Sequence, residues 1–292
     1  MKDIYQQITD SIIEKLQAGV TPWACPWDRS TVSVMPHNFK TKVDYTGINI
    51  LQLWFSAMEK GYTSSAWLTF KQAKDLGGKV RRGEKATIGI FYKRVEKEET
   101  NKETGETEDK GYNLAKPFYV FNLDQIDGIE EEKTELGQEF EPIEAAEQLL
   151  INSGANIKHG GNGAFYQHTN DFINLPDKIR FKQAADYYAT ATHELTHWTG
   201  HKSRLDRDSK SRFGTPEYAF EELIAEIGSA FINAELGLEG DLQHESYIAH
   251  WLEALENDKK FIFKAASQAS KAHQYLKQVL AGQVQNKGVE AA

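Results

Sequence analysis

Two histidines four residues apart constrain this chain more than any other feature. Residues 193–197 read His-Glu-Leu-Thr-His. On a helix, positions i and i+4 share one face, so both imidazoles can reach one metal ion. Glu194 can then take a proton from a water held beside them, as a catalytic base. Residues Phe181 to Thr192 predict a helix leading into this motif, and Gly200 is suited to end it. The alternative is a surface helix that carries two histidines.

A second, acidic helix is predicted from Pro216 to Leu236. Its broad apolar stripe indicates burial, yet Glu222 and Glu226 stand four apart on one face within it. Buried carboxylates need partners, and a divalent metal with its ligand histidines would supply them. Neutralisation by arginines such as Arg204 or Arg207 is the alternative. A catalytic zinc takes three protein ligands plus water, for example two His and one Glu.

The spacing of Glu222 and Glu226 is similar to the glutamate helix of the gluzincins, the thermolysin-like metallopeptidases. This resemblance implies that Glu222 joins His193 and His197 as a metal ligand and that Glu226 orients a ligand histidine. Reversed roles for the two glutamates stay open. Zinc suits such a donor set best, and manganese or cobalt could occupy it.

His201 is a further candidate beside the motif. The longer metzincin motif would place its third histidine at position 203, which is a serine here. His201 comes two residues too early, and it lies roughly 12 Å from His193 along a straight helix at 1.5 Å per residue. We interpret His201 as a substrate or transition-state contact, with an ordinary surface histidine as the alternative.

Composition favours a cytoplasmic protein of two domains. The chain has 292 residues and one cysteine, which excludes a disulfide framework. No apolar run approaches eighteen residues, and the first residues do not resemble a signal peptide, so no membrane partner is expected.

The net charge of −9 hides a strong asymmetry. Residues 1–94 hold fourteen Lys and Arg against eight Asp and Glu, a balance of +6. The rest of the chain holds twenty against thirty-five, a balance of −15. The basic end could meet a polyanion, whereas the acidic remainder is expected to repel one.

Charged stretches divide the chain. The run Glu96–Lys110 has no apolar residue, which predicts a solvated hairpin tip or a disordered insertion between strands Thr87–Val95 and Phe118–Leu123. The acidic stretch 130–141 is interpreted as a linker between domains 1–129 and 142–285. In the second domain, a short strand near Asp171–Pro176 precedes the histidine helix. That order suits a cleft in which an edge strand pairs with extended peptide.

Aromatic and basic residues gather in the N-terminal region. Aromatic faces that can stack on bases, beside cations that can follow a backbone, are what single-strand binding requires. The predicted phosphate contacts are Lys79, Arg81, Arg82 and Lys85, and the predicted stacking residues are Trp23, Trp27 and Trp67. The alternative is structural: tryptophans build cores, and glycine-rich basic turns are often hairpins.

Taken together, these motifs resemble the ArdC-type antirestriction proteins of conjugative plasmids over nearly the whole chain. The stretches that carry the resemblance are residues 23–27, 45–49, 67–73 and 77–84, then 193–201, 203–207, 213–214 and 218–226. The resemblance implies an α+β fold of two domains, an N-terminal α/β domain that binds single-stranded DNA and a C-terminal, mainly helical zincin-like metallopeptidase domain with a small sheet. It also implies protection of incoming DNA from restriction during transfer.

Two functions follow as hypotheses. In the first, DNA binding recruits an active zinc peptidase to restriction enzymes or other proteins on DNA. In the second, the protein is a DNA-coating shield whose metal domain is structural. An intact Glu194 favours the first, because a structural site needs ligands but no base.

Overall fold

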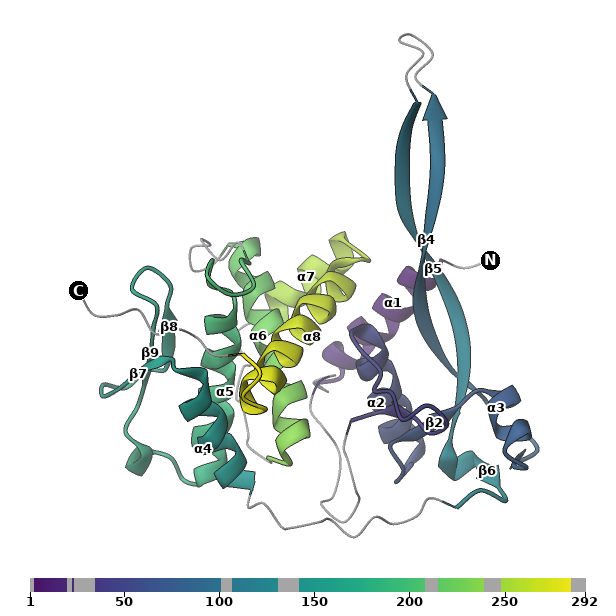
Figure 1. Ribbon diagram of the computed structural model, residues 1–292, viewed down its shortest axis with the longest axis horizontal. Helices are drawn as coiled ribbons and strands as arrows, with labels where there is room; N and C mark the ends of the chain where they lie inside the picture. The colour runs from purple at the N-terminus through teal and green to yellow at the C-terminus, as the bar shows by residue number, and fades with distance from the viewer. Residues whose placement is uncertain are drawn as a thin grey trace.

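The computed structural model describes residues 3–19, 23, 35–100, 107–130, 142–207, 215–238 and 248–284. Within these ranges an N-terminal region carries most of the strand structure, and a mainly helical C-terminal region carries a small sheet (Figure 1). The α+β class and the two-domain architecture are therefore confirmed. The expected boundaries flank residues 131–141, which lie outside the described residues, so the linker stays a prediction.

The N-terminal region combines short helices with a mixed sheet in the order β1-β2-β5-β4, beside a two-stranded pair of β3 and β6. Its elements are α1 (Ile4–Gln17), β1 (His37–Asn38), α2 (Ile48–Lys60), β2 (Ala66–Leu68), α3 (Phe70–Asp75), β3 (Lys79–Val80), β4 (Thr87–Thr100), β5 (Thr107–Asn122), η1 (Leu123–Gln125) and β6 (Ile126–Asp127).

A long hairpin of β4 and β5 projects from the body of the molecule (Figure 1). The strands pair antiparallel from Thr87 opposite Val120 to Thr100 opposite Thr107. Strand structure therefore continues well beyond the expected end at Val95. Backbone hydrogen bonds form the ladder without apolar side chains, so a solvated polar run can extend it.

The first two helices begin in different ways. Asp3 accepts from the backbone N–H of Tyr5 at the start of α1. Helix α2 begins after Gly47, which has a φ of 60° and makes no side-chain cap. Asn49 exchanges two hydrogen bonds of 2.8 Å with the backbone of Ile90 and so ties α2 to β4.

The C-terminal region packs helices beside a three-stranded sheet in the order β7-β9-β8. The strand expected near Asp171–Pro176 is β9, which is the central strand of this sheet, so the expectation that it forms the edge beside the cleft is wrong. The edge strand that contacts the histidine helix is β8. None of the described helices is long and apolar enough to cross a membrane. The elements are α4 (Pro142–Ser153), β7 (Asn156–His159), β8 (Phe165–Gln167), β9 (Phe172–Leu175), η2 (Lys178–Arg180), α5 (Ala184–Thr199), α6 (Pro216–Leu236), α7 (Ile248–Asn257) and α8 (Phe261–Leu280).

One hydrophobic cluster is shared by the two regions, beside further clusters that belong to one region only. Trp54 of α2 is fully buried, and its ring centroid lies 5.6 Å from that of Phe231 on α6. Trp23 packs edge-on against Trp251 of α7, with centroids 5.3 Å apart. Ile90 of β4 belongs to the same cluster. The N-terminal helices and the helices of the C-terminal region therefore bury one another's apolar faces.

Candidate metal centre

Helix α5 carries both histidines of the motif on one buried face. The helix begins at Ala184, later than the expected Phe181, because residues 178–180 form a 3-10 turn and Phe181 is extended. The imidazole rings of His193 and His197 lie 4.9 Å apart at an interplanar angle of 78°. His193 and Glu194 are buried within the helix packing. The i, i+4 spacing thus places the two imidazoles side by side on one face of the helix.

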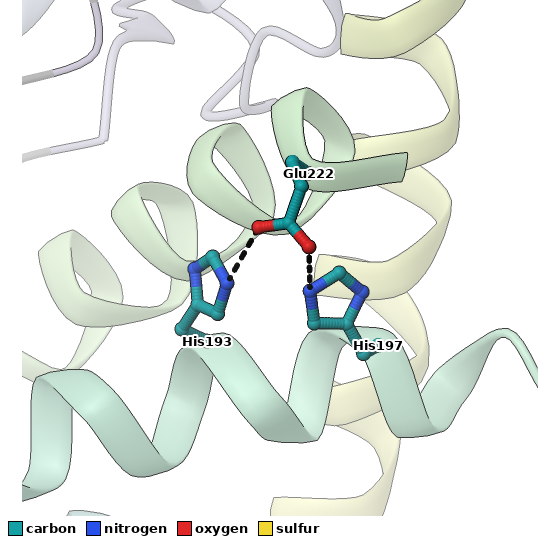
Figure 2. Close-up of side chains that lie close together, drawn as sticks. All are labelled: His193, His197 and Glu222. Carbon is teal, nitrogen blue, oxygen red and sulfur yellow. Dashed lines mark ion pairs between the residues drawn. The ribbon is translucent and has the colours of Figure 1, made fainter. Parts of the chain in front are cut away.

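Helix α6 brings Glu222 to both histidines (Figure 2). Its Oε2 lies 3.6 Å from Nε2 of His193, and its Oε1 lies 3.5 Å from Nε2 of His197. One donor atom from each of the three residues lies within 4.8 Å of the others. Two imidazole nitrogens and a carboxylate oxygen in such proximity are a donor set that a divalent metal such as zinc can use.

A glycine in the middle of α6 allows this close approach. A Cβ atom at Gly228 would lie 2.6 Å from Cγ2 of Thr196 on α5. One turn further along, Thr192 Oγ1 and Asn233 Oδ1 are 2.7 Å apart and tie the two helices together. Glycine weakens a helix interior by about 0.5–1 kcal/mol, which the α5–α6 packing offsets here.

Burial and charge shift the pKa values at the centre in opposite directions. Burial would lower the pKa of His193, but its hydrogen bond to Glu222 and the surrounding carboxylates outweigh burial and raise the pKa to about 9. Burial would raise the pKa of Glu222, but the same hydrogen bond and both histidines lower it to about 2. Burial raises the pKa of Glu194. The centre without metal therefore favours a charged His193–Glu222 pair.

Two further glutamates of α6 face the outer nitrogens of the histidines. Glu226 Oε1 lies 3.8 Å from Nδ1 of His193, and Glu221 Oε1 lies 3.3 Å from Nδ1 of His197. The guanidinium of Arg207 holds Glu221 at 2.9 Å. Sequence reasoning missed Glu221, although its position next to Glu222 in a buried helix was a signal. Arg207 pairs with Glu221, and Arg204 pairs with Asp171, in place of the suggested neutralisation of Glu222 and Glu226.

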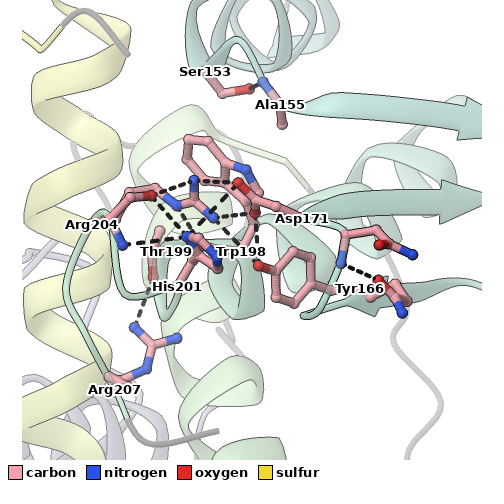
Figure 3. Close-up of polar contacts among 12 residues, drawn as sticks. Ser153, Ala155, Tyr166, Asp171, Trp198, Thr199, His201, Arg204 and Arg207 are labelled. Atoms are coloured by element: carbon pink, nitrogen blue, oxygen red, sulfur yellow. Dashed lines mark hydrogen bonds and ion pairs between the residues drawn. The ribbon is translucent and has the colours of Figure 1, made fainter. Parts of the chain in front are cut away.

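A polar cluster braces the segment after α5 against the small sheet (Figure 3). Arg204 lies over the ring of Trp198, with its guanidinium carbon 3.9 Å from the centroid, and pairs with Asp171. The hydroxyl of Tyr166 on β8 donates to the same carboxylate at 2.7 Å. The backbone N–H of Tyr166 in turn donates to the Glu194 carboxylate. The cluster therefore links the edge strand to the candidate base.

His201 lies at the border of this cluster. Its Nδ1 is 2.8 Å from Ser203 Oγ and 3.9 Å from Asp171 Oδ2, and its ring centroid is 5.3 Å from that of His168. Burial lowers the pKa of His201, which keeps its imidazole neutral at pH 7. His201 is thus placed away from the three converging donors, and its contact with substrate stays a prediction.

The structure treats the predicted DNA contacts differently. Trp23 and Trp67 are 3% and 1% exposed, so neither can offer a ring face to a base, and the expectation for these two is corrected. Arg81 bonds to Glu84 within its own turn and, across to η1 and β6, to the carbonyl of Asp124 and to Asp127. Lys79, Arg82 and Lys85 are exposed, and Trp27 lies outside the described residues.

Comparison with known families divides the chain in the same way as the fold. Residues 2–121 match the family described as the N-terminal domain of anti-restriction factor ArdC. Residues 144–268 match the family of zincin-like metallopeptidases. The second match includes α5 and α6, and with them the whole candidate centre.

Individual relatives cover nearly the full chain. The crystal structure of antirestriction ArdC protein from plasmid R388 in its metal-free form has a TM-score of 0.81 at 42% identity, covering 97% of this chain and 100% of that one. Its Mn(II)-bound structure has a TM-score of 0.79 at 41% identity, covering 96% and 98%.

Curated relatives extend the comparison. Uncharacterized protein y4eC of Sinorhizobium fredii (strain NBRC 101917 / NGR234) is 38% identical over 91% of this chain and 89% of its own length. DNA primase TraC of Escherichia coli is 41% identical over 100% of this chain but 28% of its own length. The chain therefore spans less than a third of the primase that it matches.

Proposed function

Because the chain belongs to the ArdC family of antirestriction proteins, we propose that it binds single-stranded DNA and protects incoming plasmid DNA from host restriction. Incoming DNA meets restriction enzymes in the cytoplasm, so we place the protein there. We also propose that the candidate centre is a zinc-dependent peptidase site acting on restriction enzymes or other proteins held on that DNA. The observation that supports peptidase activity most is Glu194, buried beside the converging donors of His193, His197 and Glu222.

In the proposed centre, His193, His197 and Glu222 would hold the metal. Bound zinc would lower the pKa of a coordinated water and polarise a peptide carbonyl. Glu194 would take up a proton from the attacking water at its carboxylate. As the water oxygen bonds to the carbonyl carbon and the C–N bond breaks, Glu194 would deliver this proton to the leaving amide nitrogen. Burial raises the pKa of Glu194, which suits a group that must both accept and return a proton near neutral pH.

Three other groups orient these residues. Glu226 and Glu221 face the Nδ1 atoms of His193 and His197, so that each imidazole presents Nε2 to Glu222. The N–H of Tyr166 holds the Glu194 carboxylate from the side of β8. Since β8 is an edge strand, an extended polypeptide can pair with it and so pass the centre.

The choice of metal follows from the same donor set. Two histidines and one glutamate favour zinc. The related ArdC protein from plasmid R388 has been crystallised with Mn(II), so manganese is the second metal to be tested.

One substitution distinguishes the two hypotheses, protection by an active peptidase and protection by DNA coating alone. Glu194→Gln keeps the metal donors and removes the base, so antirestriction should fall to the level of a strain without the protein. The control is Glu217→Gln, which removes an exposed carboxylate from the start of α6. Transfer of unmodified plasmid into a restricting host would be measured for both. Full protection by Glu194→Gln would favour the shield, in which DNA coating alone protects.

A further inference from the structure

A groove of about 900 Å³ opens between the base of the β4–β5 hairpin and α8. It is distinct from the candidate metal centre, because none of the residues that line it belongs to α5 or α6. The two sides are tied by the backbone N–H of Gly47, which donates to Ser270 Oγ of α8 at 2.6 Å. The groove is therefore built jointly by the N-terminal and C-terminal regions.

The hairpin side of the groove is an aromatic surface. Phe118 lies directly over Gly89 of the paired strand, where a Cβ atom would come within 2.3 Å of its ring. Tyr45 stacks on Phe118 at an interplanar angle of 12°, with centroids 6.1 Å apart. Phe91 continues the surface 6.4 Å from Phe118 and is 46% exposed. Gly89 thus holds one ring in place, and Phe91 presents the next ring to solvent.

The α8 side of the groove is basic, although the C-terminal part of the chain is acidic overall. From Lys259 to Val284 the sequence has five lysines and no Asp or Glu. Lys260, Lys264 and Lys271 line the groove and are exposed. They stand four and seven residues apart, which places them along one face of the helix.

The acidic groups around these lysines are already paired. Asp44 also lines the groove, but it lies 3.6 Å from Lys277 of α8. Lys264 lies 2.8 Å from Asp258, with both side chains largely exposed. Exposed pairs of this kind hold weakly and give way to a better partner. The lysines of the groove can therefore turn to an incoming anion.

We infer that this groove holds the single-stranded DNA, with a base stacked on the exposed ring of Phe91, beside the partly buried Phe118, and with phosphates beside Lys260, Lys264 and Lys271. The inference rests on the proposed DNA binding and adds the place where the strand lies. Aromatic faces opposite a row of cations are what sequence-tolerant single-strand binding uses. The bases of a duplex are stacked on each other inside the helix and cannot reach these rings. The helix α8 of the metallopeptidase region thereby becomes half of the DNA site.

The test measures binding of an oligothymidylate to the full chain over a series of salt concentrations. Each phosphate contact contributes about 0.7 to the slope of log affinity against log salt. Lys264→Gln with Lys271→Gln should therefore lower the slope by about 1.4 and weaken binding at least tenfold at low salt. The matched control, Lys182→Gln with Lys202→Gln, removes the same charge from exposed positions outside the groove and should leave the slope unchanged.

A second pair of variants tests stacking. Phe91→Leu keeps an apolar side chain but removes the ring, and roughly tenfold weaker binding is expected. Phe91→Trp keeps an aromatic ring and should bind about as tightly as the wild type, which a merely structural role for Phe91 would not predict. Thermal melting of each variant shows whether the fold is intact.

The possible outcomes distinguish failure of the proposed DNA binding from failure of the groove as the place where the strand lies. If the wild type binds no single strand, the proposed function fails. If it binds, and only Lys79→Gln with Arg82→Gln lowers the salt slope, the strand lies on the basic turn of residues 77–85 and the groove is overturned. If the groove variants alone lower the slope and Phe91→Trp binds about as tightly as the wild type, the groove is the site.

Discussion

At the residue scale, metal and protons compete for His193. Glu222 and the neighbouring carboxylates raise the pKa of His193 to about 9, so the site without metal is protonated at neutral pH. A metal ligand must be the neutral imidazole, and binding therefore releases this proton. We expect the apparent affinity for zinc to fall about tenfold for each pH unit lowered from 8 to 6. Chelator competition at fixed ionic strength measures this, and a flat profile would contradict the raised pKa.

The three glutamates of α6 are predicted to differ in how strongly they affect metal binding. Glu222→Gln replaces the charged carboxylate donor with a neutral amide and should abolish stoichiometric zinc. Glu226→Gln and Glu221→Gln leave all three donors and should each weaken zinc by about 10–100-fold, since they only orient a histidine. Metal analysis after dialysis and chelator titration measure both effects. A larger loss for Glu226→Gln than for Glu222→Gln would exchange their roles.

Residues of the site could be predicted where local sequence spacing identifies them, but not where their position depends on how two helices pack. His193 and His197 follow from their spacing on one helix, whereas Glu222 was preferred to Glu226 only through the resemblance to the glutamate helix of the gluzincins. The structure brings the donor atoms of His193, His197 and Glu222 together. Glu221 faces His197 only because of how α6 is rotated against α5, which no local pattern states. Trp23 and Trp67 show the same limit, because composition cannot separate a buried ring from a stacking surface.

At the scale of elements, the contact between α5 and α6 sets the geometry of the centre. Gly228→Ala would place a methyl group 2.6 Å from Cγ2 of Thr196, so we expect destabilisation of about 1–3 kcal/mol together with weaker metal binding. Thr196→Ser removes the opposing methyl group and keeps the hydroxyl that donates to the Thr192 carbonyl. The double variant should therefore recover both properties.

Urea unfolding of the four proteins in this cycle gives the coupling energy. Additive losses, with no recovery in the double variant, would mean that the close approach at Gly228 does not position Glu222.

Element ends were predictable where a cap residue marks them. Helix α6 runs from Pro216 to Leu236 as expected, because Pro suits the first turn and Gly237 adopts the left-handed conformation that ends it. Helix α5 has no side-chain cap, and its start was placed three residues early. The central position of β9 and its parallel pairing with β7 depend on long-range contacts that sequence periodicity does not contain.

At the scale of the whole molecule, the N-terminal and C-terminal regions depend on each other for stability. Trp54 and Phe231 pack in one core although they belong to different regions. Trp54→Ala should therefore cost about 3–5 kcal/mol and lower the stability of both regions in a single transition. Loss of bound metal reports the C-terminal region, and circular dichroism reports the whole fold. Separate midpoints for the two signals would contradict a shared core.

The sequence predicted a basic N-terminal and an acidic C-terminal region, but not that lysines of the C-terminal region would line a groove together with the N-terminal region. Charge averaged over 198 residues suggested that the C-terminal part repels DNA, whereas Lys260, Lys264 and Lys271 form a local basic face within it. Averages lose such faces because a few side chains on one side of a helix decide the local potential.

The shared core also limits how this protein could be reassembled during evolution. Two modules with separate cores can be exchanged singly, but here an exchange of either half would expose the apolar face of the other. Transfer of both halves together keeps this shared cluster buried. The match to the TraC primase, which takes in 100% of this chain within a much longer protein, is what such joint inheritance would leave behind.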